Sequence, residues 1–288
     1  MIEKLKYQFT IANYRNVIKI ANDLLKQESY NNDYTVLMYK AASYANLMED
    51  ENAISVYQSI IDNYPNLVEP RIRIVEVQIE IGQYDVARNH LSHARAIEPE
   101  NLDVINNQIY ISEQLHEFQK VIDLSTEAIE IDETETSVWL TRASARERMQ
   151  DYELAIKDGL KAISLSRNDE IYLQLAYNDL GYTYLKKGDY LNAELYLRKA
   201  IEVDETEPLQ YNNLGLVLAL CGKVDEGLKY INHSINIDHL NSYAYKNRAK
   251  VYLMKGNKNK ARKDLEKAKD MDYHIDYDNE VNELLLTL

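Results

Sequence analysis

The stretch that decides the fold is residues 177–200, YNDLGYTYLKKGDYLNAELYLRKA. Apolar and small residues recur three or four positions apart in its first half, as at Tyr177, Leu180 and Gly181. This spacing places them on one face of a helix. The pattern stops at Gly188, which suits a turn, and then resumes. The segment therefore predicts two short amphipathic helices joined by a turn.

The same pattern recurs along the chain at a step of 34 residues. Tyr211 and Tyr245 repeat the position of Tyr177, and the turn glycine returns at Gly222 and Gly256. A fixed period of this length is typical of helix-turn-helix repeats that stack into a solenoid. Small residues on the facing sides of the two helices allow the helices to approach closely.

The order aromatic-x-x-Leu-Gly-x-x-Tyr, followed by Ala-x-x-x-large, occurs in several copies in register and resembles the tetratricopeptide repeat family. The resemblance implies an all-α fold: a right-handed superhelical solenoid of tandem antiparallel helix pairs, with about eight repeats and a C-terminal capping helix. We expect one solenoid over residues 1–288. Its units are a degenerate repeat at 1–33, repeats at 34–67, 68–101, 102–135, 136–169, 174–207, 208–241 and 242–275, and a capping helix at 276–288.

The repeat at 136–169 departs from the pattern. Arg142 and Arg146 stand where large apolar residues are usual, and Gly159 is expected opposite them. Four extra residues, 170–173, precede the next repeat and correspond to about one helical turn. A hinge or a small anion site is one interpretation of this irregularity.

The alternative interpretation gives the two arginines a structural role. Their stems would pack along apolar surface while the guanidinium groups reach water or carboxylates such as Glu147 and Glu153. An arginine at the position of Arg142 and Arg248 is also common in the family that the chain resembles.

Composition limits the kinds of partner. The 288 residues carry a formal net charge of -14, which repels nucleic acid and anionic membranes. Cys221 is the only cysteine, and the N-terminal residues lack the apolar run of a signal peptide or spanning helix. We expect a cytoplasmic protein that binds neither nucleic acid nor membrane.

The sequence contains no phosphate-binding loop, nucleophile elbow or cysteine pair. His90 and His93 lie three apart on a helix but have no evident third ligand, and zinc needs at least three protein ligands. An acidic run near the C-terminus lacks the glycine turn of a calcium loop; it consists of Asp270, Asp272, Asp276, Asp278 and Glu280. We therefore expect no cofactor, no metal and no catalytic residues.

The first helices of a solenoid line a concave groove, whose side chains are free to bind a ligand. The family resemblance maps the groove onto Glu76, Glu80, Asn106, Asn107, Tyr110, Arg148, Asn178, Tyr182, Asn212, Asn213, Lys246, Asn247 and Lys250. The asparagines could hold a peptide backbone, and the tyrosines could offer flat apolar contacts. Alternatively, asparagine is simply frequent at this repeat position, and tyrosine is abundant throughout the chain.

The predicted groove changes charge along its length, from acidic near Glu76 and Glu80 to basic near Lys246 and Lys250. A ligand would then present basic groups to the N-terminal half and an acidic group to the two lysines. These lysines match the first pair of the clamp with which some family members hold chaperone tails. They lie in the last full repeat, so the later members of that clamp have no repeats to occupy.

These features favour a non-enzymatic adaptor, scaffold or assembly factor that binds a protein or an extended peptide. The alternatives are a regulator or inhibitor that captures a signalling peptide or an enzyme, and an enzyme with an unrecognised site. If Leu285 or Leu286 remains exposed, the C-terminal helix could also pair two copies of the chain.

Overall fold

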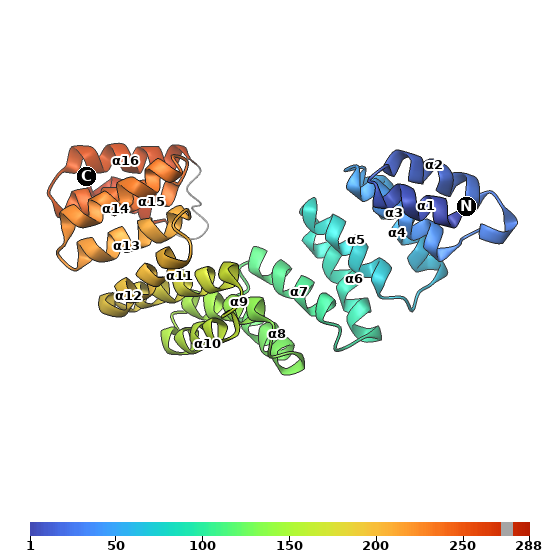
Figure 1. Ribbon diagram of the computed structural model, residues 1–288, viewed down its shortest axis with the longest axis horizontal. Coiled ribbons are helices and arrows are strands. Elements are labelled where there is room, and N and C mark those ends of the chain that lie inside the picture. The colour runs from blue at the N-terminus through green and yellow to red at the C-terminus, as the bar shows by residue number, and fades with distance from the viewer. Residues whose placement is uncertain (272–278) are drawn as a thin grey trace. The chain divides into compact units, whose positions relative to one another are not determined.

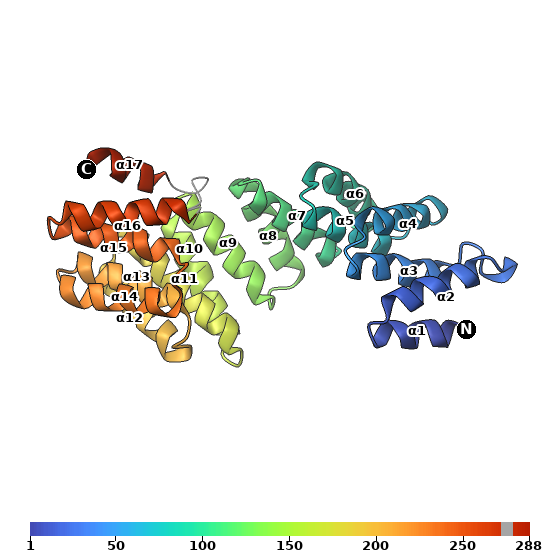
Figure 2. The same ribbon diagram turned by 90° about the horizontal axis from the view of Figure 1, so that it is seen from above.

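The computed structural model describes residues 1–271 and 279–288, and all regular structure in these residues is helical. Seventeen α-helices follow one another there, with one short 3₁₀-helix, and consecutive helices pack as antiparallel pairs (Figure 1, Figure 2). The predicted all-α fold of tandem antiparallel helix pairs is therefore confirmed. The helices form two compact units, Met1–Asp132 (unit 1) and Glu133–Leu288 (unit 2), and each is described by itself.

Unit 1 contains eight of the α-helices and the 3₁₀-helix. They are α1 (Ile2–Thr10), α2 (Tyr14–Leu25), the 3₁₀-helix η1 (Glu28–Tyr30), α3 (Tyr34–Asn46), α4 (Asp50–Asn63), α5 (Glu69–Glu80), α6 (Tyr84–Ile97), α7 (Leu102–Gln114) and α8 (Phe118–Ile131). Each odd-numbered helix packs against the even-numbered helix that follows it, and α1, α3, α5 and α7 also contact one another in order. The odd-numbered helices therefore form one continuous layer.

Unit 2 repeats this arrangement with nine described helices. They are α9 (Thr136–Arg148), α10 (Tyr152–Leu165), α11 (Glu170–Lys187), α12 (Tyr190–Val203), α13 (Pro208–Leu220), α14 (Val224–Ile237), α15 (Ser242–Met254), α16 (Lys258–Asp270) and α17 (Glu280–Thr287). The first helices α9, α11, α13 and α15 contact one another in order. None of the helices in the described residues is both long and apolar enough to cross a lipid bilayer.

Close packing within a pair depends on small residues at the contact. A Cβ atom on Gly181 would lie 2.7 Å from Cγ of Leu197, which confirms the predicted close approach of α11 and α12. The contact between α13 and α14 is tighter still, since a Cβ on Gly227 would lie 2.4 Å from the carbonyl oxygen of Gly215. These glycines bring the two helix backbones into direct contact.

The turn within each pair requires one residue in the left-handed backbone region. Glycine fills this position four times, at Gly82, Gly188, Gly222 and Gly256, with φ between 72° and 87°. Residues with a side chain also fill it four times, at Ala12, Met48, His116 and Gln150, with φ between 56° and 64°. The conformation is thus set by the repeat and not by the presence of glycine.

The irregular repeat contains a buried ion cluster. Arg142 binds Asp158 through two parallel hydrogen bonds of 2.9 Å each, and Arg146 donates to the same carboxylate at 2.5 Å. Asp158 is 1% exposed. The structural interpretation of the arginines is therefore correct, but their carboxylate partner is Asp158 and not Glu147 or Glu153.

The only tryptophan lies beside this cluster. The guanidinium carbon of Arg142 lies 4.8 Å from the centre of the Trp139 ring, and the indole N–H donates to the carbonyl oxygen of Glu133 at 2.9 Å. The ring is thus held at both its face and its edge.

The four extra residues before the next repeat form the first turn of α11. This helix has 18 residues, whereas α9 and α13 have 13 each. Asp169 caps the extended start, because its side chain accepts hydrogen bonds from the backbone N–H groups of Ile171 and Tyr172. The predicted additional turn is confirmed.

The predicted capping helix at 276–288 corresponds to α17. Residues 272–278 lie outside the described part of the chain, and they include Asp272, Asp276 and Asp278 of the acidic run. Val281 is buried, and Leu284, Leu285 and Leu288 pack against the core of unit 2. Leu286 is 87% exposed. One exposed leucine offers far less apolar area than a stable dimer interface needs, so the pairing of two copies stays a prediction.

Candidate functional site

Side chains from α9, α11, α13 and α15 line a groove of about 680 Å³ in unit 2, which we call the unit-2 groove. Eight of the thirteen predicted site residues meet there: Arg148, Asn178, Tyr182, Asn212, Asn213, Lys246, Asn247 and Lys250. They come from four successive first helices, because each repeat places the same helix face toward the groove.

The asparagines of the unit-2 groove hydrogen-bond to one another. Asn213 donates to Asn178 at 3.2 Å, and Asn247 donates to Asn212 at 3.0 Å, in each case across 35 residues of sequence. Asn212 and Asn247 are 1% and 5% exposed. These amides therefore tie neighbouring first helices together, a role that the sequence interpretation did not foresee.

The two predicted anion-binding lysines already hold a carboxylate of the chain. Glu280, at the start of α17, lies 3.3 Å from Nζ of Lys246 and 2.6 Å from Nζ of Lys250. Lys246 is 7% exposed, whereas Lys250 is half-buried. An acidic group of a ligand would have to displace or join Glu280 at this end of the groove.

Two carboxylates lie in the middle of unit 2 with altered acidity. Burial is the main cause that raises the pKa of Asp179 to about 6. The hydrogen bond from Asn178 lowers this pKa, and the negative charge of Glu147 raises it further. Burial also raises the pKa of Glu147, while the charges of Lys186 and Arg148 lower it. Asp179 lines the groove, so its charge there changes near neutral pH.

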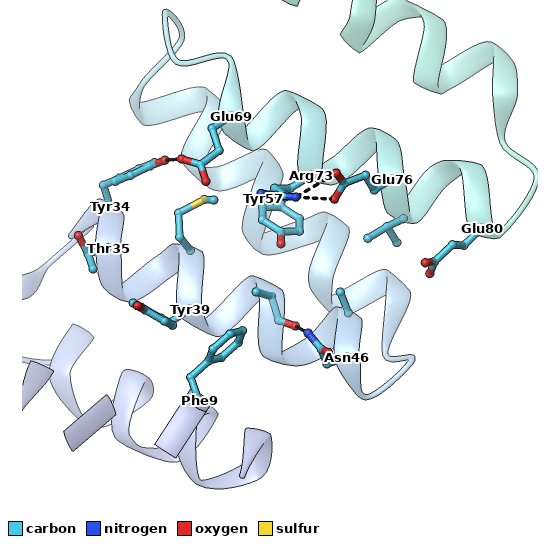
Figure 3. Close-up of a pocket in the computed structure, with 14 residues that line it drawn as sticks. Phe9, Tyr34, Thr35, Tyr39, Asn46, Tyr57, Glu69, Arg73, Glu76 and Glu80 are labelled. Carbon is cyan, nitrogen blue, oxygen red and sulfur yellow. Dashed lines mark hydrogen bonds and ion pairs between the residues drawn. The ribbon is translucent and has the colours of Figure 1, made fainter. Parts of the chain in front are cut away.

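Glu76 and Glu80 line a separate pocket of about 640 Å³ in unit 1, which we call the unit-1 pocket (Figure 3). It is formed by side chains from α1, α3, α4 and α5. Two of its carboxylates are held in place: Tyr34 donates a hydrogen bond to Glu69 at 2.6 Å, and Arg73 donates to both oxygens of Glu76 at 3.0 and 3.1 Å.

The three remaining predicted residues lie on α7 and line neither of these cavities. Asn107 donates to the carbonyl oxygen of Asp103, one turn earlier in the same helix, at 2.8 Å. Asn106 is exposed, and Tyr110 is 43% exposed. They share a helix with one another but not a site with the other ten.

Sequence reasoning missed the aromatic part of the unit-1 pocket. Phe9 comes from α1 and Tyr57 from the second helix α4, whereas the prediction considered first helices of regular repeats. Phe9 packs edge to face with Tyr39 at 5.1 Å between ring centres. The concentration of aromatic residues before Tyr64 is the signal that could have indicated it.

The histidine pair does not gain ligands in the structure. His93 bonds through Nδ1 to the carbonyl oxygen of Asn89 at 2.7 Å, and burial together with the charge of Arg71 lowers the pKa of His90. Within residues 1–271 and 279–288, His, Cys, Asp and Glu side chains form no group of three or more that could hold a metal ion.

Family models described as tetratricopeptide repeat match residues 35–67, 136–169 and 175–207. A curated relative, the DnaJ homolog subfamily C member 7 homolog of Dictyostelium discoideum, is 23% identical over 222 residues. The match includes 71% of this chain and 40% of the relative, so the chain spans less than half of that relative's length.

Solved structures share the fold. A tetratricopeptide repeat protein from Parabacteroides merdae aligns with a TM-score of 0.74 at 17% identity, over 86% of this chain and 96% of that one. A chain in the APC/C hetero-tetramer Cut9-Hcn1 aligns with a TM-score of 0.64 at 17% identity, over 99% of this chain and 54% of that one. At these identities the likeness concerns the fold alone.

Proposed function

Because the chain is a tetratricopeptide repeat protein, we propose that it is a non-enzymatic adaptor or assembly factor that binds an extended segment of another protein in the unit-2 groove. The observation that carries this proposal is that eight predicted site residues lie along one groove, which is lined by the first helices of four successive repeats. The aligned chain in the Cut9-Hcn1 hetero-tetramer is itself part of a protein assembly, which agrees with such a role.

The chemistry of the groove suits a peptide. Tyr182 and Tyr243 offer aromatic faces, and the ammonium groups of Lys186 and Lys246 lie 5.9 and 5.6 Å from the centres of these rings. A peptide backbone presents alternating donors and acceptors, which amides, hydroxyls and charged groups along the groove can match. Cytoplasmic residence belongs to the same proposal, because an exposed free thiol such as Cys221 is maintained in a reducing compartment.

A charge-reversal pair of variants tests the proposal. The groove variant carries Arg148→Glu and Lys186→Glu, both at exposed positions that line the groove. The matched control carries Lys157→Glu and Lys229→Glu, at exposed positions of α10 and α14 that do not line it. Both variants change the net charge by the same amount, so long-range electrostatic effects are balanced.

Tagged protein is purified from its native cell in the three forms, and the bound proteins are quantified by mass spectrometry. We expect a partner that is retained by the parent and the control and lost from the groove variant. Equal retention by all three forms would place the partner elsewhere on the molecule and reject the unit-2 groove as its site. Thermal unfolding of each form verifies that both variants remain folded.

A further inference from the structure

The unit-1 pocket has an aromatic wall. Phe9 stands on α1, Tyr34 and Tyr39 on α3, and Tyr57 on α4, and all four line the same cavity (Figure 3). The thioether of Met38 adds a polarizable group to this wall. The faces of aromatic rings carry partial negative charge and attract cations, most strongly where water is partly excluded.

The opposite side of the pocket is acidic. Glu69, Glu76 and Glu80 all line it from α5, and Arg73 is the one basic residue among the lining side chains. Arg73 donates a hydrogen bond to Glu76, and the hydroxyl of Tyr34 donates one to Glu69. These bonds fix the orientation of both carboxylates. The lining therefore carries an excess of two negative charges beside aromatic rings.

Tyr57 supplies a further polar group that the folded chain does not use. Its side chain is 2% exposed and lies in the middle of the lining residues in Figure 3. Within the described part of the chain, its hydroxyl has no hydrogen-bond partner, and burial raises its pKa so that it stays neutral. Because Tyr57 lines the pocket and its hydroxyl has no partner in the folded chain, a ligand donor can bond to this oxygen without breaking an existing hydrogen bond.

These three features agree on one class of ligand. We propose that the unit-1 pocket binds a basic side chain, lysine or arginine, presented by a segment of a partner protein. The alkyl stem would contact the aromatic rings, and the charged end would meet the carboxylates of α5 and the hydroxyl of Tyr57. This inference rests on the proposed role in protein binding, but it concerns a cavity that the test of the unit-2 groove does not touch.

Other ligand classes fit the pocket less well. An anionic group would face the excess of negative charge, and an apolar side chain would remove water from these carboxylates without adding a positive charge. The volume of about 640 Å³ falls within the range of roughly 300–1,000 Å³ for sites that enclose a small ligand, so a long side chain and part of its backbone can enter.

Methionine methyl groups provide a local test in the full chain. The protein has six methionines, and Met38 alone lines the unit-1 pocket. With ¹³C-labelled methionine methyls, the protein is titrated with blocked alanine peptides that carry one central arginine, lysine or citrulline. The signal of Met38 is assigned from a Met38→Leu variant, and the other methionines serve as internal controls.

We expect a saturable shift of the Met38 signal with the arginine peptide, the lysine peptide or both, and none with the neutral citrulline peptide. The comparison of the two basic peptides identifies which side chain is preferred. A Met38 shift of equal size with citrulline, or no saturable shift with either basic peptide, would overturn the inference.

Two substitutions separate binding from folding. Tyr57→Phe removes only the unpartnered hydroxyl, so we expect about three- to tenfold weaker binding of the basic peptide without loss of thermal stability. Glu80→Gln removes an exposed carboxylate and should weaken binding about threefold. The matched controls are Tyr84→Phe and Glu51→Gln, which lie outside the pocket and should leave the affinity unchanged.

The failure of this inference can be distinguished from the failure of the proposed function. If Met38 does not respond while the cellular partner is still lost from the unit-2 groove variant, the pocket inference is wrong and the adaptor role stands. If Met38 responds selectively while that variant retains every partner, the pocket is a binding site and the assignment of the unit-2 groove is wrong.

Discussion

Asp158 is the residue on which the irregular repeat depends, because its single buried carboxylate accepts hydrogen bonds from two guanidinium groups. We predict that Asp158→Asn lowers the free energy of unfolding of unit 2 by about 3–5 kcal/mol, since it removes the buried negative charge to which Arg142 and Arg146 both donate. Urea unfolding followed by far-ultraviolet circular dichroism measures the loss.

The control for this prediction lies in the same repeat. Asp151 is exposed, and its side chain makes no capping hydrogen bond to α10. Asp151→Asn should change the free energy of unfolding by less than about 0.5 kcal/mol. An equal loss in the two variants would show that the buried ion cluster has no special weight.

The partner of Arg142 could have been predicted from the chain itself. Arginine stands 16 residues before aspartate in two repeats, at Arg142 and Asp158 and at Arg248 and Asp264, and the second pair is also bidentate, at 2.7 and 2.8 Å. The two repeats between them carry Leu and Tyr at the same spacing, at 180 and 196 and at 214 and 230. In the two repeats that carry arginine and aspartate, these positions form an ion pair between the two helices of the repeat.

Asp179 gives unit 2 a pH-dependent stability. Its pKa rises from 3.8 to about 6 in the folded chain, so the folded state binds more protons than the unfolded state between these values. The stability of the parent should therefore fall as the pH rises from about 4 to 6, by at most about 3 kcal/mol, and this contribution should stay constant above pH 6.

Asp179→Asn removes this titration. We predict that the variant gains stability relative to the parent as the pH rises from about 4 to 6, and that the difference then levels off. Thermal unfolding at a series of pH values measures this difference. A difference that does not vary with pH would contradict the prediction.

At the scale of the element, the turn within each helix pair imposes a left-handed backbone on whatever residue occupies it. Met48 adopts φ 57° and is 88% exposed, so its side chain contributes few contacts in return. We predict that Met48→Gly stabilises unit 1 by about 1 kcal/mol, because a non-glycine residue in this region costs roughly that much. Chemical denaturation measures the change.

Gly82 provides the converse experiment at the equivalent turn. It has φ 72° with no heavy atom within 4 Å of a Cβ position, so Gly82→Ala meets backbone strain and no steric clash. It should destabilise unit 1 by about 1 kcal/mol. If both substitutions have the same sign, the turn does not set the backbone as inferred.

The helices could be predicted well because the repeat supplies the same spacing many times, and each copy supports the others. The first turn of α11 was found from the four extra residues alone. The special backbone of Met48, His116 and Gln150 could not be found in the same way, since nothing in these residue types requires it. Only alignment with the glycines of the other repeats reveals that position.

The helix α17 supplies a carboxylate to the basic end of the unit-2 groove. We predict that Glu280→Gln raises the affinity of the groove for a peptide with an acidic end by about three- to tenfold, because it removes a competing negative charge from Lys246 and Lys250. Titration of an acidic peptide, observed by calorimetry, measures the change. Glu283→Gln, at an exposed position of the same helix, should leave the affinity unchanged.

At the scale of the whole molecule, the net charge of -14 determines which macromolecules can approach. We predict no binding of duplex DNA or of vesicles with anionic lipid, even at low ionic strength, where attraction to a basic patch would be strongest. Gel-shift and vesicle co-sedimentation assays measure this. Binding in either assay would mean that local clusters of lysine outweigh the overall charge.

The candidate sites were only partly predictable, for a reason that concerns the whole chain. The family resemblance indicates which residues share the inner face, and eight of the residues it indicates line one groove. It gives no information on how side chains pair across repeats, so the Asn213 to Asn178 contact and the role of Glu280 were missed. Phe9 and Tyr57 were missed because they come from elements that the groove rule leaves out.

The position of Trp139 gives the unmodified protein an optical probe of one unit. The indole lies in unit 2 between Arg142 and the carbonyl of Glu133, and unit 1 contains no tryptophan. Fluorescence excited at the red edge of the indole band therefore originates in unit 2 alone, whereas tyrosine emission arises from both units. The melting of one half of the chain can be followed separately from that of the other without attaching any dye.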